Sequence, residues 1–401
     1  MRTQSFAEIR PESVYICFEA FPRPKGASSH IASMVEAMSK TFDSVLLICL
    51  GYADIPSFQV EDNIFIRRYK EYHPNMLKRA EGFADFISKT LKQCAENVRL
   101  TIFRDPWSGA PAIISGIPGK KIFEVNALPS WELEYTYPNI KNNISLMTKI
   151  TDLELLCLRN SDSLLTVSDT TAKALSSIGI NKDICVIPNS AHNAFFTNEK
   201  CQIAELHKGR WFGYFGSLHS WQGVETAVNA FADIADEIPH FNMLIVTGGK
   251  KIARKLLRKR IRKKGIEERV LFIPSLPTIE LATAINMLEF TVCPLTETRR
   301  NTFQGCCPIK IVESMAAGKP VIASDLEVCR KLIKNYHNGL LVSAANRRKW
   351  ALSILQLANN GVLLNKLATN ARRTAEDKFA RNNIHKRLTD YFLRTIRQNG
   401  D

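Results

Sequence analysis

The stretch GCCPIKIVESMAAGKPVIAS, residues 305–324, decides the fold of the second half of the chain. Its spacing predicts a helix over residues 309–317, because apolar residues recur there on one stripe, namely Ile309, Val312, Met315 and Ala316. Gly318 is placed to end that helix, since glycine is favoured just after a helix C-terminus. Val321–Ser324 then forms a short apolar run, which is typical of a strand buried on both faces of a parallel sheet.

Two charged residues lie at the start of this predicted helix. Lys310 and Glu313 are three residues apart, so they share one side of the helix. The free backbone N–H groups and the dipole at a helix N-terminus favour an anion. We therefore expect Lys310 and the amides to bind phosphate, and Glu313 to accept hydrogen bonds from ribose hydroxyls. The alternative is an ordinary amphipathic helix whose Lys–Glu pair lies on the surface.

The pattern Pro-x-Lys-x-x-Glu-x-Met-Ala-x-Gly-x-Pro-Val-x-Ala-Ser over residues 308–324 resembles the C-terminal nucleotide-binding motif of the family 4 retaining glycosyltransferases. The resemblance implies an α/β fold of the GT-B architecture, with two Rossmann-like parallel-sheet domains facing a central cleft. It also implies that Glu313 holds the ribose. The usual hallmark of the family is Glu-x7-Glu, and Gly305 stands here in place of the first glutamate. The resemblance is therefore to the Pro-x-Lys-x-x-Glu form of the motif, without the usual contact to the donor sugar.

The composition is that of a globular protein of two ordinary domains, with 401 residues, 45% of them hydrophobic and 23% charged. No apolar run reaches the roughly 18 residues that a transmembrane helix needs. The first residues lack the apolar core of a signal peptide. The ten cysteines form neither Cys-x-x-Cys pairs nor metal-ligand spacings, and Cys17, Cys49 and Cys293 lie in apolar runs. These features predict a cytoplasmic protein with free thiols.

The net charge of +15 is concentrated in the second half of the chain. Residues 1–190 hold 21 basic and 21 acidic side chains, so the excess belongs entirely to residues 191–401. Ten of the fifteen residues of Lys250–Lys264 are basic, and the spacing predicts a helix with one narrow apolar stripe formed by Ile252, Leu256, Leu257 and Ile261. This run is either a solvated helix face or a peripheral contact with an anionic membrane. Nucleic acid is disfavoured as a partner, since no aromatic residue is interleaved for base stacking.

The first half alternates apolar strands with helical segments, which predicts βαβ units and a parallel sheet. We expect strands at residues 13–19, 44–50, 99–103, 121–125, 163–167 and 184–187. A loop containing Gly26 follows the first strand and leads into a helix at residues 31–39. This loop is either a phosphate cradle or a plain turn. The resemblance implies that Gly26 faces the donor phosphates and the acceptor.

Polar side chains follow two of these strands. Ligands of open parallel sheets bind at the carboxyl ends of the strands, so we expect Arg104, Asp105, Glu124 and Asn126 to point toward one cleft. Asp105 and Asn126 are the catalytic candidates of this half, with Lys310 as the third. The alternative for each residue is a loop cap or a structural ion pair. Many members of the family have a histidine near the position of Asn126, and it is missing here.

The second half repeats the alternation, with strands expected at residues 211–215, 243–247, 270–273 and 290–293. A strand, Gly216 and a helix start again form an anion site. Most members of the family neutralise the donor diphosphate with an arginine and a lysine in this loop. Ser217 and Gln222 hold those positions here, and Lys310 is expected to compensate, with Arg299 and Arg300 as further candidates.

The resemblance thus implies a retaining, metal-independent glycosyltransferase of the hexosyltransferase type, and we expect no cofactor. Its donor is a UDP-, GDP- or ADP-linked sugar and its acceptor a glycan or glycolipid, as in cell-surface polysaccharide synthesis. The expected domains are an acceptor domain over 1–190, a nucleotide-sugar domain over 191–380, and a helix over 381–401 that returns to the first domain. The alternatives are a sugar-nucleotide 2-epimerase and a nucleotide-sugar-binding pseudoenzyme.

Overall fold

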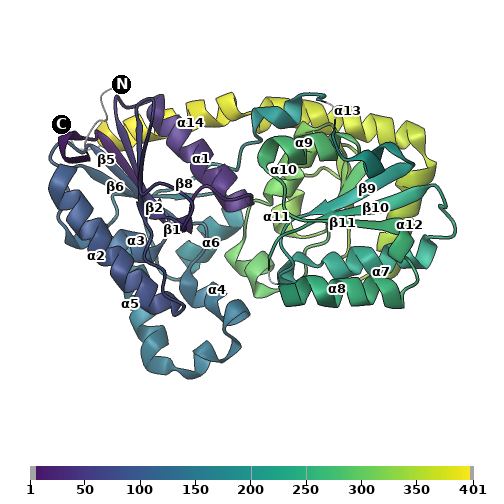
Figure 1. Ribbon diagram of the computed structural model, residues 1–401, viewed down its shortest axis with the longest axis horizontal. Helices are drawn as coiled ribbons and strands as arrows, with labels where there is room; N and C mark the ends of the chain where they lie inside the picture. Colours follow the sequence, from purple (N-terminus) through teal and green to yellow (C-terminus); the bar gives the residue numbers. More distant parts are fainter. Residues whose placement is uncertain (1–5, 200, 250, 398–401) are drawn as a thin grey trace. The chain divides into compact units, whose positions relative to one another are not determined.

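The computed structural model describes residues 6–199, 201–249 and 251–397, and the chain divides into two compact units (Figure 1). Of the described residues, the first unit comprises those within 1–23, 30–188 and 385–401, and the second those within 24–29 and 189–384. The sequence places the domain boundaries at residues 190 and 380, a few residues from these limits. It places residues 24–29 in the first domain, whereas their contacts assign them to the second unit.

The described strands of the first unit form an eight-stranded sheet in the order β3-β4-β2-β1-β5-β6-β7-β8. Every neighbouring pair is parallel except β3 with β4. The central strands are almost wholly buried, which explains their continuous apolar runs. The strands are β1 (Ser13–Ala20), β2 (Val45–Leu50), β3 (Phe58–Glu61), β4 (Ile64–Tyr69), β5 (Leu100–Phe103), β6 (Lys120–Glu124), β7 (Ser163–Thr166) and β8 (Ile184–Val186).

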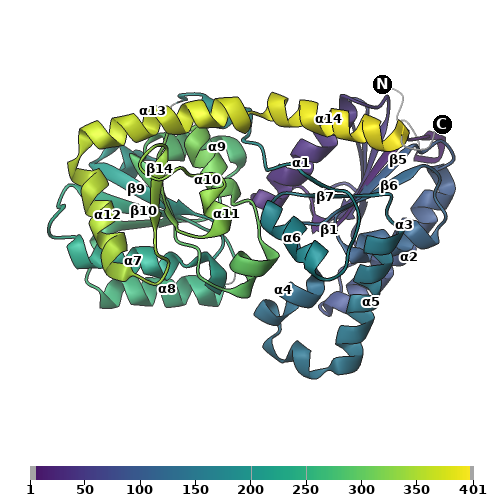
Figure 2. The same cartoon turned by 180° about the vertical axis from the view of Figure 1, so that it is seen from behind.

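Helices cover both faces of this sheet (Figures 1 and 2). Helix α3 packs between α2 and α5 on one face. On the other face α1 and α14 lie side by side, joined by a hydrogen bond of 2.9 Å between the hydroxyls of Thr41, just after α1, and Thr389. The helices are α1 (Gly26–Ser39), α2 (Met76–Cys94), α3 (Pro106–Ile114), α4 (Pro129–Thr136), α5 (Ile144–Asn160), α6 (Asp169–Ser177) and α14 (Arg381–Arg397).

The described strands of the second unit form a six-stranded, wholly parallel sheet in the order β11-β10-β9-β12-β13-β14. This is the order of a doubly wound dinucleotide-binding fold, in which ligands bind where the strand order reverses, here between β9 and β12. The strands are β9 (Arg210–Phe215), β10 (Phe241–Val246), β11 (Val270–Ile273), β12 (Phe290–Cys293), β13 (Val321–Ser324) and β14 (Gly339–Val342).

Helices α7 and α8 lie on one face of this second sheet, and α9 and α10 lie on the other (Figures 1 and 2). Helix α7 packs against α12, and α10 packs against α13. The helices are α7 (Val224–Ile234), α8 (Lys251–Lys263), α9 (Thr278–Asn286), α10 (Ile309–Ala316), α11 (Glu327–Arg330), α12 (Arg347–Asn359) and α13 (Gly361–Lys378). The Lys250 end of the predicted basic helix lies outside the described residues.

The sequence prediction misses the β3–β4 hairpin and helices α3 and α4. Exposed polar residues interrupt the apolar pattern of the hairpin, whose turn contains Asp62 with a φ of 53°. Two prolines obscure α3: Pro106 fits the first turn, where no N–H is needed, and Pro111 lies within the helix. Residues 129–136 show too little amphipathic periodicity to predict α4.

The cysteines are free thiols in the part of the chain that the structure describes. Cys17, Cys49 and Cys293 are completely buried, which confirms that they are small core residues. None of the described helices has the length and apolar character that crossing a membrane requires.

Candidate nucleotide-sugar site

Helix α10 begins at the sheet edge of the second unit and is buried almost all round. Ile311, Val312 and Met315 pack in the core, but Lys310 and Glu313 are also buried, with 8% and 4% of their surface exposed. The predicted stripe is buried at Val312, Met315 and Ala316, while Ile309 is only half-buried, and the polar side of the helix is enclosed as well. This burial also excludes the alternative of a surface Lys–Glu pair. No side chain caps the N-terminus of α10, which follows Pro308.

Two side chains in contact with Lys310, those of Gln222 and Tyr214, fix the position of its ammonium group. Its Nζ donates a hydrogen bond of 2.7 Å to Oε1 of Gln222 and lies 4.2 Å from the centre of the Tyr214 ring. The phenol of Tyr214 donates in turn to the carbonyl of Ser217. Burial lowers the pKa of Lys310, against the attraction of nearby thiols and of Glu313. Ser217 and Gln222, which lack charge, thus contribute to the placement of Lys310.

Two glycines let the backbone approach closely at this point. Gly216 follows β9 with a φ of 137°, and a Cβ there would lie 2.9 Å from Nζ of Lys310. Gly223 precedes α7 with a φ of 63°, and a Cβ there would lie 1.8 Å from the carbonyl oxygen of Pro294. Because Pro294 follows β12, the start of α7 is held against the point where the strand order reverses.

Glu313 has only 4% of its surface exposed, and its carboxyl group accepts no hydrogen bond from any residue that the structure describes. Burial raises its pKa to about 8, although Lys310 and Arg381 act to lower it. A buried carboxyl group normally has hydrogen-bond donors around it, because leaving it without them is costly. Glu313 is therefore suited to accept hydrogen bonds from a ligand.

The other predicted phosphate-binding residues of this unit have different surroundings. Gly26 lies beside the start of α10, where a Cβ would be 3.1 Å from Cγ2 of Ile309. Arg300 donates a hydrogen bond of 2.7 Å to the carbonyl of Gly305. Arg299 lies 4.7 Å from the ring of Phe303. Both arginines thus contact their own loop, whereas Lys310 extends toward Gly216.

The first unit has a second cluster of polar groups at the carboxyl end of β6. Glu124 is completely buried and accepts hydrogen bonds from the phenol of Tyr15, at 2.5 Å, from Nδ2 of Asn126 and from Nε2 of His30. Burial acts to raise its pKa, but His30, Arg104 and Tyr15 outweigh burial and hold the pKa of Glu124 at about 2. The carboxylate is therefore ionised and fixes the position of the three donors.

Asp105 caps the N-terminus of α3. Its Oδ1 accepts from the backbone N–H and the hydroxyl of Ser108, each at 2.9 Å, and its Oδ2 accepts from the backbone N–H of Phe18 at 2.8 Å. Burial raises its pKa to about 6, despite these bonds. Both oxygens thus hold α3 and β1 together, which corresponds to the loop cap considered for this residue in the sequence.

Sequence reasoning brings Glu124 and Asn126 together correctly but misses Tyr15 and His30. Tyr15 lies within the apolar run of β1, where nothing in the sequence distinguishes it from a core aromatic residue. His30 follows the Gly26 loop by four residues, and a titratable side chain at such a helix start is a signal that could have identified it.

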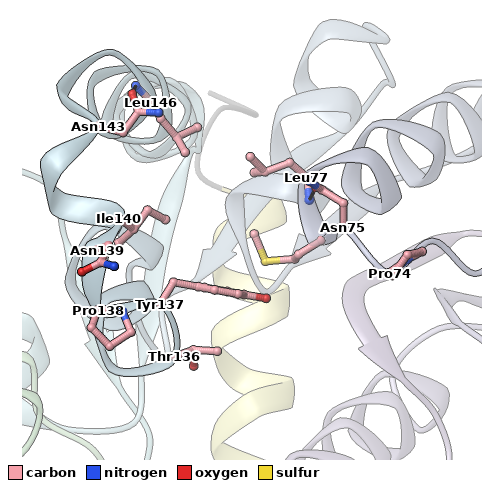
Figure 3. A pocket seen from close by; sticks show the side chains of 11 residues that line it. Pro74, Asn75, Leu77, Thr136, Tyr137, Pro138, Asn139, Ile140, Asn143 and Leu146 are labelled. Carbon is pink, nitrogen blue, oxygen red and sulfur yellow. Dashed lines mark hydrogen bonds between the residues drawn. The ribbon is translucent and has the colours of Figure 1, made fainter.

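The first unit also contains a pocket of about 580 Å³, between the start of α2 and the segment from α4 to α5 (Figure 3). Tyr137 extends from that segment into the pocket, and Leu77 and Leu146 face it from the two sides. None of the predicted site residues lines it. Because no charged side chain is among its lining residues, it offers a diphosphate no counter-charge, unlike the surroundings of Lys310.

Comparison with known proteins relates the second unit to a family. Residues 196–374 match the model of the family described as glycosyl transferases group 1. A region of 184 residues is 27% identical to a D-inositol 3-phosphate glycosyltransferase of Jonesia denitrificans, covering 44% of this chain and 42% of that relative. The chain therefore matches less than half of the length of this curated relative.

Solved structures share the fold of the whole chain. Sucrose-phosphate synthase of Thermosynechococcus elongatus matches with a TM-score of 0.78 and 15% identity, over 97% of this chain and 100% of that one. The HepE protein of Anabaena, solved in complex with UDP and glucose, matches with a TM-score of 0.71 and 15% identity, over 96% and 100%. The predicted fold class, an α/β protein of the GT-B type with two parallel-sheet domains, is confirmed.

Proposed function

We propose that this chain is a retaining glycosyltransferase that transfers a sugar from a nucleotide sugar to a polar acceptor. The observation that carries the proposal is the buried carboxyl group of Glu313, which has no donor among the described residues, beside the fixed ammonium group of Lys310. The match of residues 196–374 to the glycosyl transferases group 1 model supports it.

The second unit binds the donor in this proposal. Glu313 accepts hydrogen bonds from the ribose hydroxyls, and Lys310 binds the diphosphate together with the uncapped N–H groups of α7 and α10. Gln222 holds Lys310 in place, and Gly216 leaves room for its ammonium group. We expect a uridine nucleotide first among the candidates, because the HepE protein was solved with UDP and with UDP-glucose.

The chemistry consists of positioning and electrostatic stabilisation. The bond between the anomeric carbon and the diphosphate oxygen breaks, and a bond from the acceptor oxygen forms on the same face of the sugar. The acceptor hydroxyl gives up its proton to the departing diphosphate. Lys310 and the backbone amides stabilise the charge that develops on the diphosphate, so no covalent intermediate and no metal is required.

The first unit binds the acceptor in this proposal, which is a glycan or glycolipid. Glu124 orients the imidazole of His30 and the amide of Asn126, and these two groups contact acceptor hydroxyls. Asn126 therefore keeps a role at the acceptor, while Asp105 supports the site by holding α3. We assign the enzyme to the cytoplasm and to the synthesis of cell-surface polysaccharide or glycolipid.

Calorimetric titration with UDP, GDP and ADP tests the donor assignment, and transfer assays with the corresponding sugar nucleotides test the reaction. We expect one of the three nucleoside diphosphates to bind. We also expect the matching sugar nucleotide to transfer its sugar to an acceptor and to release that nucleoside diphosphate. Isomerisation of the free sugar nucleotide would indicate a 2-epimerase, and binding without turnover a pseudoenzyme. Binding of none of the three would contradict the proposal. Turnover should be unchanged by EDTA.

A further inference from the structure

The basic helix α8 presents an aliphatic pair to solvent. Ile252 and Leu256, one turn apart, have 67% and 62% of their surface exposed, whereas Leu257 and Ile261 are buried in the core of the second unit. The predicted single stripe of all four residues is therefore wrong. An offset of five residues turns a helix by about 140°, so the two pairs lie on nearly opposite sides.

Lysines surround the exposed pair. Lys255, Lys259 and Lys263 follow one another at intervals of four residues, so they lie along the same side of α8 as Ile252 and Leu256. Each is exposed, and none of the three forms an ion pair with a carboxylate of the described residues. Like charges at this spacing repel one another, and here the repulsion is not offset by a neighbouring acid.

The flanking arginines differ in this respect. Arg260 forms an ion pair of 2.7 Å with Glu225 on α7, and Arg262 forms one of 2.9 Å with Glu267. The arginines at the edges of this face are thus neutralised within the protein. The three lysines at its centre are exposed to solvent beside the aliphatic side chains of Ile252 and Leu256.

We propose that this face of α8, formed by Ile252, Lys255, Leu256, Lys259 and Lys263, is a docking surface for an anionic membrane. Lysines attract anionic headgroups, and aliphatic side chains between them enter the boundary of the acyl chains. A nucleic acid would need the cations but would place its phosphates against Ile252 and Leu256. The aliphatic pair therefore favours lipid. This surface is independent of the proposed donor site.

The test is sedimentation of the full chain with vesicles of phosphatidylcholine, alone or mixed with phosphatidylglycerol. Binding is expected only to the mixed vesicles, and it should weaken as salt is added. Reversing Lys255, Lys259 and Lys263 to Glu together should weaken it by at least about a hundredfold, given the contribution of each lysine near a charged surface. The matched control reverses Lys349, Lys366 and Lys378, which are exposed on α12 and α13 and give the same change in net charge.

A second pair of variants tests the aliphatic contact. Ile252→Ser with Leu256→Ser should weaken binding about tenfold or more, since two side chains lose their apolar burial. Ile279→Ser with Val362→Ser changes two other exposed aliphatic residues of the same unit and should leave binding unchanged. A parent protein that does not bind the mixed vesicles would overturn the proposal. So would equal effects of the α8 variants and their controls, or binding to an RNA oligomer in place of vesicles.

Discussion

The two units each bury a glutamate, and the two carboxyl groups have opposite surroundings. Glu124 of the first unit accepts hydrogen bonds from Tyr15, His30 and Asn126, which together with nearby charge hold its pKa at about 2. Glu313 of the second unit has no donor among the described residues, and burial raises its pKa to about 8. Burial thus disfavours both charges, and only the donors and charges around Glu124 reverse that effect.

The difference indicates two kinds of role. The bonds of Glu124 are complete within the fold, so this residue positions other side chains. The charges of Lys310 and Arg381 offset only part of the cost of burying Glu313, and a ligand with paired hydroxyl groups would offset more of it. In this chain the number of donors, and not the extent of burial, separates Glu124 from Glu313.

The largest effect is expected at Lys310, because it is the buried cation of the proposed diphosphate site. Lys310→Met should reduce turnover by about a thousandfold, the upper range for loss of one preorganised charge-stabilising donor. It should weaken binding of UDP much more than that of uridine. The control is Lys349→Met, at an exposed position of the same unit. Turnover within tenfold of the parent would instead favour Arg299 or Arg300 as the phosphate partner.

The next effect concerns stability, at Glu124. Its pKa of about 2 lies below its ordinary value of 4.5, so its ionised form stabilises the fold above pH 4.5 and this contribution is lost as the pH falls toward 2. Glu124→Gln should therefore lower the free energy of unfolding at pH 7 by about 3 kcal/mol, and by much less near pH 3. Denaturant titrations at both pH values measure this, with the exposed Glu81→Gln as the control. A difference that does not depend on pH would contradict the assignment.

A smaller effect is expected at Gly216. In Gly216→Ala the new Cβ would lie 2.9 Å from Nζ of Lys310, and UDP binding should weaken by roughly tenfold, the equivalent of about 1.4 kcal/mol. Gly249→Ala is a matched control, because its φ of 95° imposes backbone strain while a Cβ there meets nothing within 4 Å. If both variants bind UDP equally well, the close approach of Gly216 to Lys310 does not matter for binding.

Much of the fold could be predicted, because buried parallel strands leave continuous apolar runs that a sequence shows directly. The β3–β4 hairpin and α3 could not, since exposed strands and prolines break those patterns. Helix α8 was predicted as a helix, but its two aliphatic pairs could not be sorted into buried and exposed. That distinction depends on which side of the helix faces the sheet.

The candidate site could be predicted only in part, for a physical reason. Lys310 and Glu313 are close in sequence, so the helix repeat alone brings them together. Tyr15, His30 and Glu124 come from separate elements, and only the sheet order places them in contact. The absence of donors around Glu313 is likewise a property of three-dimensional packing that no spacing reveals.

The most direct test of the account is calorimetric titration of UDP into the parent protein and Glu313→Gln across pH 6.5 to 8.5, in buffers of different ionisation enthalpy. With a pKa of about 8, Glu313 is largely protonated at pH 7 in the free protein. Ribose hydroxyls that donate to its carboxylate would lower this pKa, so that Glu313 loses its proton when UDP binds. We predict that the parent releases close to one more proton than the variant at pH 7. We also predict that, at pH 8.5, the parent binds UDP about 10- to 100-fold more tightly than Glu313→Gln does, as expected for charged hydrogen bonds. Equal affinities and equal proton release in the two proteins would show that Glu313 does not hold the ribose.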